Sequence, residues 1–187
     1  MRRLIRLIVP LSCLLALATG AHAEASSPAP TVGVQDVPTQ AAAMQRLTFM
    51  VGFWAGSGWN LTPAGVRQDF VQTEHVKYQA SNLVISVEGE GRDPADLRRV
   101  VDSALAVINF NDTTSQYRWE AFSQGFVTVA TPVVGTNTFQ WSLVTGGPTI
   151  RYTLTFTATT WHEIGEVTLD GGTTWHQNFQ MDLYRIH

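Results

Sequence analysis

The chain has 187 residues, with 12 Lys and Arg against 15 Asp and Glu, and 44% of them are hydrophobic. This acidic balance argues against a nucleic-acid-binding surface and against binding to an anionic membrane. The one cysteine, Cys13, leaves the chain without an internal disulfide and without a thiolate metal site.

Residues 1–23 have the three parts of a secretory signal peptide: a basic start, an apolar run over 7–18, and a small-residue end at Ala23. The apolar run is shorter than the roughly 20 residues that span a bilayer. A lipid anchor on Cys13 is disfavoured because that residue lies inside the run. We predict cleavage after Ala23 and a periplasmic or secreted bacterial protein, whose mature part carries 9 basic and 15 acidic residues, a net charge of −6.

The mature chain is predicted to begin with a disordered tether over 24–40, which is rich in Pro and Ser. A folded domain then covers 41–187. Thr39 is expected to cap a short helix over 41–47 that packs on the rest of the domain. A second helix is predicted within 94–104, in a connection between strands.

From residue 53 onward, apolar and polar residues alternate in short runs that turn residues separate, which is typical of antiparallel strands. The predicted strands are 53–59, 69–78, 83–88, 104–110, 117–122, 126–134, 138–144, 150–156, 161–169 and 174–186. Gly-rich tight turns are expected at 145–148 and 170–172, because Gly accepts positive φ. The fold class is therefore all-β: a single antiparallel up-and-down barrel of about ten strands with a short N-terminal helix, although a sandwich stays open.

The first predicted strand carries Gly52, Trp54, Gly56 and Gly58 in the spacing G-x-W-x-G-x-G. This segment resembles the opening of calycin-type barrels, the superfamily of lipocalins, fatty-acid-binding proteins and nitrobindins. In physical terms, the glycines suit a sharp bend and close backbone approach, and Trp54 is large enough to plug the base of a barrel. We therefore interpret all four residues as structural.

The end of the chain, over 161–166, 170–175 and 181–185, resembles an exported bacterial family of lipocalin-like domains of unknown function. The two resemblances anchor both ends of the region 44–187. They imply a fold, and they do not imply an activity.

The histidines of the last predicted hairpin, His162 and His176, are the candidate metal or haem ligands. A tight turn would set His162 near Phe179 and His176 near Gly165, so the two would not meet without a bulge. Nitrobindins bind haem through a His on a late strand, and this resemblance makes haem a minority hypothesis. Alternation places His176 on the face opposite the apolar one, toward solvent. We predict no cofactor, with haem as the alternative.

Aromatic residues make up 10% of the chain and concentrate in the central and late strands. They fill a core, or they line an apolar cavity, since a barrel of this size is wider than one that side chains just fill. Two charged residues of the 117–122 strand share one face and would anchor a ligand if that face were internal. The cavity candidates are Trp119, Trp141, Tyr152, Trp161, Arg118 and Glu120.

Three functions follow. The first is a lipocalin-like barrel that binds a small apolar or amphipathic molecule. The second is a haem-binding or enzymatic barrel that uses His162 and His176, which inward-facing His162, Glu163, Arg118 or Glu120 would favour. The third is a packed structural or interaction module, which a filled core and an exposed apolar patch would favour. No nucleophile elbow, phosphate loop or other catalytic motif is present in the sequence.

Overall fold

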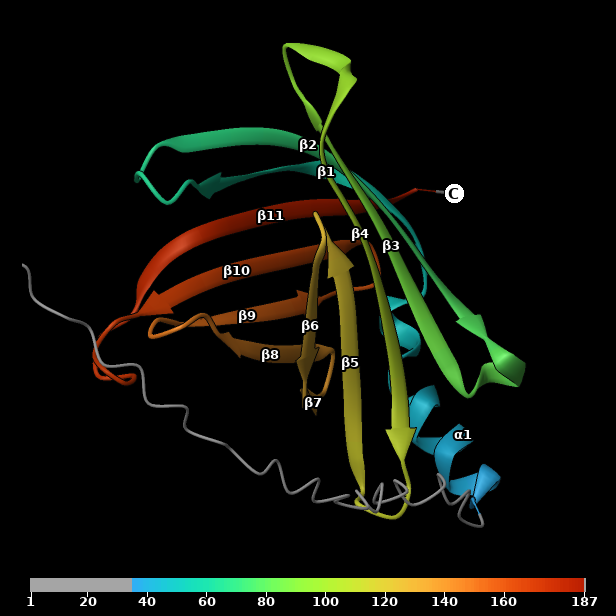
Figure 1. The fold of residues 1–187 in the computed structure, drawn as a ribbon. Coiled ribbons are helices and arrows are strands. Elements are labelled where there is room, and N and C mark those ends of the chain that lie inside the picture. The colour runs from blue at the N-terminus through green and yellow to red at the C-terminus, as the bar shows by residue number, and fades with distance from the viewer. Residues whose placement is uncertain (1–34, 187) are drawn as a thin grey trace, which may run out of the picture. The chain divides into compact units, whose positions relative to one another are not determined.

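The computed structural model describes residues 35–186. The signal peptide predicted over 1–23, and the tether as far as residue 34, lie outside the described residues. Within 35–186, eleven antiparallel strands form one sheet that curls around an interior, with the short helix α1 beside it (Figure 1). The all-β, calycin-like barrel predicted from the sequence is confirmed.

The helical segments are α1 (Val37–Gln45), η1 (Thr48–Met50) and η2 (Ala80–Asn82). The strands are β1 (Gly52–Leu61), β2 (Arg67–Gln79), β3 (Val84–Asp93), β4 (Asp96–Asn111), β5 (Gln116–Ser123), β6 (Phe126–Ala130), β7 (Val133–Gly135), β8 (Thr138–Val144), β9 (Thr149–Phe156), β10 (Thr160–Thr168) and β11 (His176–Ile186). Of these helical segments, α1 is the only one longer than a single turn in the described part of the chain.

The strands pair in the order β6-β5-β4-β3-β2-β1-β11-β10-β9-β8-β7, with every pair antiparallel. The first and last strands join directly: Phe53 lies opposite Ile186, and Asn60 lies opposite Phe179. The two edges of the sheet, β6 and β7, follow each other in the chain, and β6 also packs against β8. The sheet thus curls until its edges meet at Thr131 and Pro132.

Strand β2 shows how alternation fills the interior. Phe70, Gln72, Glu74 and Val76 are buried, while the residues between them are more exposed. Two polar side chains therefore point inward in the same phase as two apolar ones. This pattern departs from the usual rule for half-buried strands, in which the inner face is apolar, and it marks the interior as more than a hydrophobic core.

One end of the barrel is closed by α1 and η1. Met44, Leu47, Met50 and Trp54 have no exposed surface there, and the Trp54 indole donates a hydrogen bond of 2.8 Å to the Met50 carbonyl. Two tyrosines of the strands donate hydrogen bonds to the helix and hold it against the barrel. Tyr117 Oη donates to the Ala43 carbonyl at 2.7 Å, and Tyr78 Oη donates to the Met44 carbonyl at 3.3 Å.

The helix starts earlier than the sequence predicts. Asp36, and not Thr39, is its N-cap: the Asp36 carboxylate accepts a hydrogen bond of 3.1 Å from the Thr39 backbone N–H. Pro38 fits in the first turn, where its missing N–H costs nothing. Residues 37–40, which were assigned to the tether, therefore belong to the folded domain.

The helix predicted within 94–104 is wrong. Its residues form the tip and second arm of the β3–β4 hairpin, in which Arg92 lies opposite Val100. The Asp93 carboxylate accepts from the Ala95 backbone N–H at 2.8 Å, which fixes the turn between the strands. The hairpin tip projects beyond the neighbouring strands (Figure 1).

Gly56 and Gly58 lie on β1 at positions where the neighbouring chain leaves no room for a side chain. A Cβ on Gly56 would collide with the backbone of Asp182 and Leu183, and a Cβ on Gly58 would meet the Phe70 ring. Only Gly tolerates such contact without moving the neighbouring strand. Gly52 has a φ of +143°, so it serves the bend at the start of β1.

Candidate ligand-binding cavity

The barrel encloses a cavity of about 660 Å³. Met50 lines it at the end that α1 closes. At the other end it is lined by Thr62 and Pro63 of the β1–β2 connection and by Gln124 and Phe126 at the β5–β6 turn. The volume lies within the range of roughly 300–1,000 Å³ that is usual for small-molecule sites.

One wall of the cavity is a continuous run of aromatic rings. Trp119 stacks on Trp141 with centroids 5.4 Å apart, and Trp141 stacks on Tyr152 at 4.5 Å. Tyr152 then meets Phe179 edge to face at 5.5 Å, and Phe179 stacks on Phe70 at 5.8 Å. Offset and edge-to-face pairs of this kind hold one another in fixed orientations, so the wall is a preformed aromatic surface.

Four of the predicted cavity residues line this cavity. They are Trp119, Trp141, Tyr152 and Trp161. The Trp161 ring meets the ring of Trp54, with centroids 6.0 Å apart and the ring planes at a right angle. That these rings contact a ligand stays a prediction.

The cavity also contains two buried carboxyl groups. Glu74 reaches it from β2 and Glu163 from β10, with exposed fractions of 9% and 8%. Burial, together with the nearby charge of Glu74, raises the pKa of Glu163 to about 8, although an interaction with the Trp161 side chain acts against this shift. Burial raises the pKa of Glu74 to about 7, although its hydrogen bond from Gln72 acts against this shift. Removing a carboxylate from water disfavours its charged form, which explains both directions.

Two glycines make room for these polar groups. A Cβ on Gly89 would lie 2.6 Å from Glu74 Oε1 and 2.8 Å from Oε2, and a Cβ on Gly91 would lie 2.9 Å from Gln72 Oε1. Both glycines belong to β3, directly beside β2. Because these two β3 residues have no side chain, the side chains of Gln72 and Glu74 pack directly against the β3 backbone.

Several buried polar atoms on the cavity wall have no hydrogen-bond partner. Glu74 Oε2, Trp119 Nε1 and Asn178 Oδ1 are among them. Leaving a buried polar atom unpaired costs roughly 1–3 kcal/mol, and such atoms call for an explanation. All three atoms belong to residues that line one cavity, beside the aromatic wall. A polar group bound in this cavity would give them hydrogen-bond partners.

Arg118 and Glu120 do not reach the cavity, which corrects their place among the cavity candidates. They pair with each other at 2.7 Å on the outer face of β5, with side-chain exposures of 52% and 34%. Tyr117, Trp119 and Ala121 of the same strand point inward. Since side chains alternate along a strand, their neighbours must point outward.

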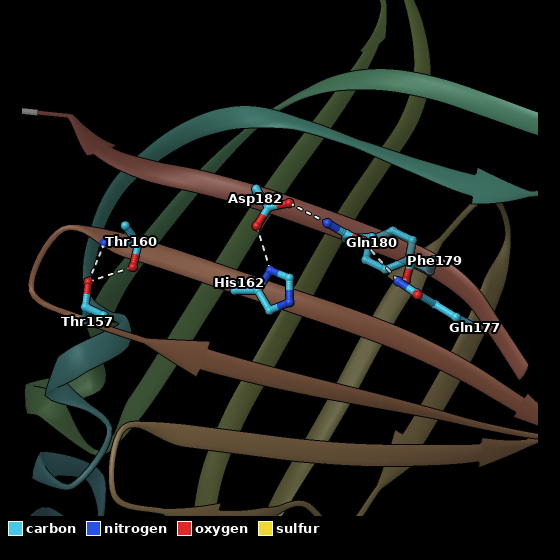
Figure 2. Close-up of polar contacts among 7 residues, drawn as sticks. All are labelled: Thr157, Thr160, His162, Gln177, Phe179, Gln180 and Asp182. Atoms are coloured by element: carbon cyan, nitrogen blue, oxygen red, sulfur yellow. Dashed lines mark hydrogen bonds and ion pairs between the residues drawn. The ribbon is translucent and has the colours of Figure 1, made fainter. Parts of the chain in front are cut away.

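His162 and His176 also lie outside the cavity. His162 Nδ1 is 2.6 Å from Asp182 Oδ1 on the outer surface of β10 and β11, and Gln180 donates to the same carboxylate at 2.8 Å (Figure 2). His176 is exposed and lies opposite Val167. Among the residues that line the cavity there is no His.

The register of the last hairpin therefore differs from the prediction. His162 faces Asp182 rather than Phe179, and the bulge between Gly165 and Glu166 shifts the remaining pairs. The connection is longer than a tight turn because Asp170 organises it: its carboxylate accepts from the Thr174 backbone at 2.9 Å and from the Thr174 hydroxyl at 2.6 Å.

These positions do not fit a haem held inside the barrel by either histidine. No group of three metal-ligating side chains occurs within residues 35–186. Of the four residues whose inward orientation would favour an enzyme, only Glu163 faces the cavity. No helix among the described residues is long and apolar enough to cross a membrane.

Sequence reasoning missed Glu74 as a cavity residue, together with Gln72, Asp102 and Asn178. A signal was available for two of them. Period-two alternation places Gln72 and Glu74 on the same face of β2 as the apolar residues Phe70 and Val76. For Asp102 no such signal existed, because its strand was read as a helix there.

Comparison with known proteins supports the fold. No protein-family model and no curated protein matches the sequence. Among solved structures, Rv2717c from M. tuberculosis matches with a TM-score of 0.58 and 12% identity, over 78% of this chain and 98% of that one. The S-type phycobiliprotein lyase CPES from Guillardia theta matches with a TM-score of 0.55 and 11% identity, over 82% of this chain and 99% of that one. At these identities the likeness is one of fold.

Proposed function

We propose that this protein binds a small amphipathic molecule inside its barrel. The observation that carries the proposal is the cavity of about 660 Å³, in which an aromatic wall and unpartnered polar atoms lie side by side. The apolar part of the ligand packs on Trp119, Trp141 and Tyr152. Its polar part meets Glu74 and Glu163.

The energetic case has two parts. Removing apolar surface from water contributes roughly 25 cal/mol per Å², and the aromatic wall offers such surface without having to rearrange. A polar group on the ligand also satisfies buried atoms that the protein leaves unpaired, such as Glu74 Oε2 and Trp119 Nε1. A ligand with both parts gains from both terms.

The two alternatives gain less from the structure. A packed module needs a filled core, whereas this interior is hollow. A barrel that works through His162 and His176 needs them inside, whereas both lie on the outer surface. One protein of the same fold is named a phycobiliprotein lyase, but fold likeness alone carries no substrate to this chain.

Fluorescence titration with N-phenyl-1-naphthylamine, a neutral aromatic probe, tests the proposal. We expect saturable binding with one site per chain. Ala121→Trp fills the cavity from β5 and should weaken binding at least about tenfold, which is ~1.4 kcal/mol. Phe122→Trp places the same side chain one residue along on the outer face and should leave binding unchanged. Absent saturation, or equal effects of the two variants, contradicts the proposal.

We also propose that this binding takes place in the periplasm or outside the cell, as the signal peptide predicted over 1–23 implies. N-terminal analysis of protein recovered from the exported fraction should find Glu24 as the first residue. Recovery of the protein with residue 1 intact in the cytoplasm would refute this location.

A further inference from the structure

We infer that the ligand carries a positively charged nitrogen, an amine or quaternary ammonium group attached to an aromatic frame. This inference rests on the proposed function and adds the chemical class of the ligand. It places the cationic nitrogen beside Glu74 and Glu163, next to the aromatic wall.

The first support is the sign of the charges. The ionisable residues that line the cavity are Glu74, Asp102, Glu163 and Tyr152, all of them acids, and none of the lining residues is Lys, Arg or His. A fatty acid or another carboxylate would therefore find no cation to pair with. A buried charge without a partner is costly, so the interior favours a cation over an anion.

The second support is convergence from separate strands. Glu74 belongs to β2 and Glu163 to β10, and β1 and β11 separate these strands in the sheet. The curl of the sheet turns both side chains toward one interior, and the charge of Glu74 acts on Glu163. Burial raises the pKa of both carboxyl groups, and a cation placed beside them favours their charged forms.

The third support is an atom without a partner. Glu74 Oε1 accepts a hydrogen bond of 2.7 Å from Gln72 Nε2, whereas Oε2 accepts none, although the side chain is nine-tenths buried. Asn178 Oδ1 is a second unpaired acceptor on the cavity wall. An ammonium group donates several hydrogen bonds and would satisfy these acceptors.

The aromatic wall acts in the same direction. Trp141 stacks between Trp119 and Tyr152, so the attraction of a cation by the ring quadrupoles, about 0.5–2 kcal/mol, comes from the parts of the ring faces that these contacts leave uncovered. Aromatic rings combined with carboxylates are the surroundings in which proteins hold ammonium groups. An uncharged aromatic ligand would also use the rings, but it would gain nothing from the charged form of the carboxyl groups.

Binding of a cation should release a proton. Glu163 is flanked by Leu154 and Met181, and the titratable groups that act with it around the cavity are Glu74, Asp102 and Tyr152. Burial keeps Glu163 largely protonated at pH 7, because its pKa is about 8. A neighbouring ammonium favours the carboxylate, so affinity for an amine should rise between pH 6 and pH 8.

The test uses three ligands with one ring system: 1-naphthylmethylamine, 1-naphthalenemethanol and 1-naphthoic acid. Calorimetric titration at pH 7.5 should show the amine binding at least about tenfold tighter than the alcohol, with the carboxylate weakest. Titration of the amine in two buffers of different ionisation enthalpy should reveal proton release. Equal affinities for amine and alcohol, or the tightest binding by the carboxylate, would overturn the inference.

Variants assign the preference to the carboxyl groups. Glu163→Gln and Glu74→Gln should each remove most of the difference between amine and alcohol while the alcohol still binds. Glu88→Gln, on the outer face in an ion pair with Lys77, should preserve it. If N-phenyl-1-naphthylamine binds but the amine has no advantage, only the charge inference fails. If no probe binds, the proposed function fails as well.

Discussion

The guanidinium of Arg185 lies over the ring of Trp54, 4.0 Å from its centroid. The same group donates hydrogen bonds to the carbonyl of Phe49 at 3.1 Å and to the carbonyl of Val51. One side chain near the end of β11 thus ties the last strand to the segment that precedes β1. This contact between β11 and the segment that follows α1 stabilises the base of the barrel.

Arg185→Ala should lower the free energy of unfolding by about 2–4 kcal/mol, because it removes a cation–π contact and several hydrogen bonds at a partly buried site. Urea denaturation measures the change. Arg118→Ala removes an exposed ion pair on β5 and should cost less than about 1 kcal/mol. Equal losses of unfolding free energy in the two variants would show that Arg185 contributes no more to stability than an exposed ion pair.

Stability should depend on pH through the buried carboxyl groups. The folded-state pKa of Glu163, about 8, lies above the ordinary value of 4.5, so the folded state binds more protons between these values. Proton binding by Glu163 therefore contributes fully to the stability of the folded state below pH 4.5, and this contribution is lost as the pH rises through 8. Glu74, with a pKa of about 7, acts in the same direction.

Glu163→Gln should therefore stabilise the protein at pH 8 by roughly 1–3 kcal/mol relative to the parent and change little at pH 5. Urea midpoints at the two pH values measure this. Glu88→Gln serves as the control, because the pKa of Glu88 is lowered by its hydrogen bond with Lys77. An effect of Glu163→Gln that is independent of pH would argue against a protonated carboxyl group.

Tyr117→Phe should weaken the attachment of α1 to the barrel while keeping the aromatic ring in the core. It deletes the hydrogen bond of 2.7 Å to the buried Ala43 carbonyl and should cost about 1–2 kcal/mol. Hydrogen exchange should increase in residues 37–45 more than in the strands. Tyr184→Phe, whose ring is exposed on β11, should leave exchange unaltered.

Haem provides a test of the histidine positions. If hemin added to the protein gives a Soret band, we expect that band to be the same in the His162→Ala/His176→Ala variant, since both side chains lie outside the cavity. Absorption spectra of the two proteins measure it. Loss of the band in the variant would restore the haem hypothesis.

Much of the fold could be predicted because the strand signals are local. Alternation and turn residues gave most strands within a few residues of their observed bounds, and the glycine spacing around Trp54 indicated a calycin-type barrel. The strand over 96–101 was not predicted, because this arm of the hairpin projects past the sheet and both of its faces meet solvent. There Leu97-Arg98-Arg99-Val100 shows no period of two, and the charged residues imitate a helix.

The cavity was harder to predict because it depends on which face of each strand is internal. The aromatic residues could be named, since they dominate the central strands. Arg118 and Glu120 would line the cavity only if their face of the strand were internal, and the sequence alone does not show which face is internal. Glu74 was missed because a carboxylate is expected on the outer face of a strand. Glu74 and Glu163 are buried on the inner face of the sheet, where apolar residues are the usual expectation, so the residue type alone points away from these positions.

The strand order has a consequence for the connectivity of the chain. Read from β7 through β11 and then from β1 to β6, the sheet is one unbroken meander in which each strand pairs with the next. The β1–β11 pairing takes the place of one more hairpin. A circular permutant that opens the chain at Thr131–Pro132 and joins residue 186 to residue 35 through a flexible linker keeps α1 and η1. It should therefore retain every strand pair, with all of its pairings between consecutive strands.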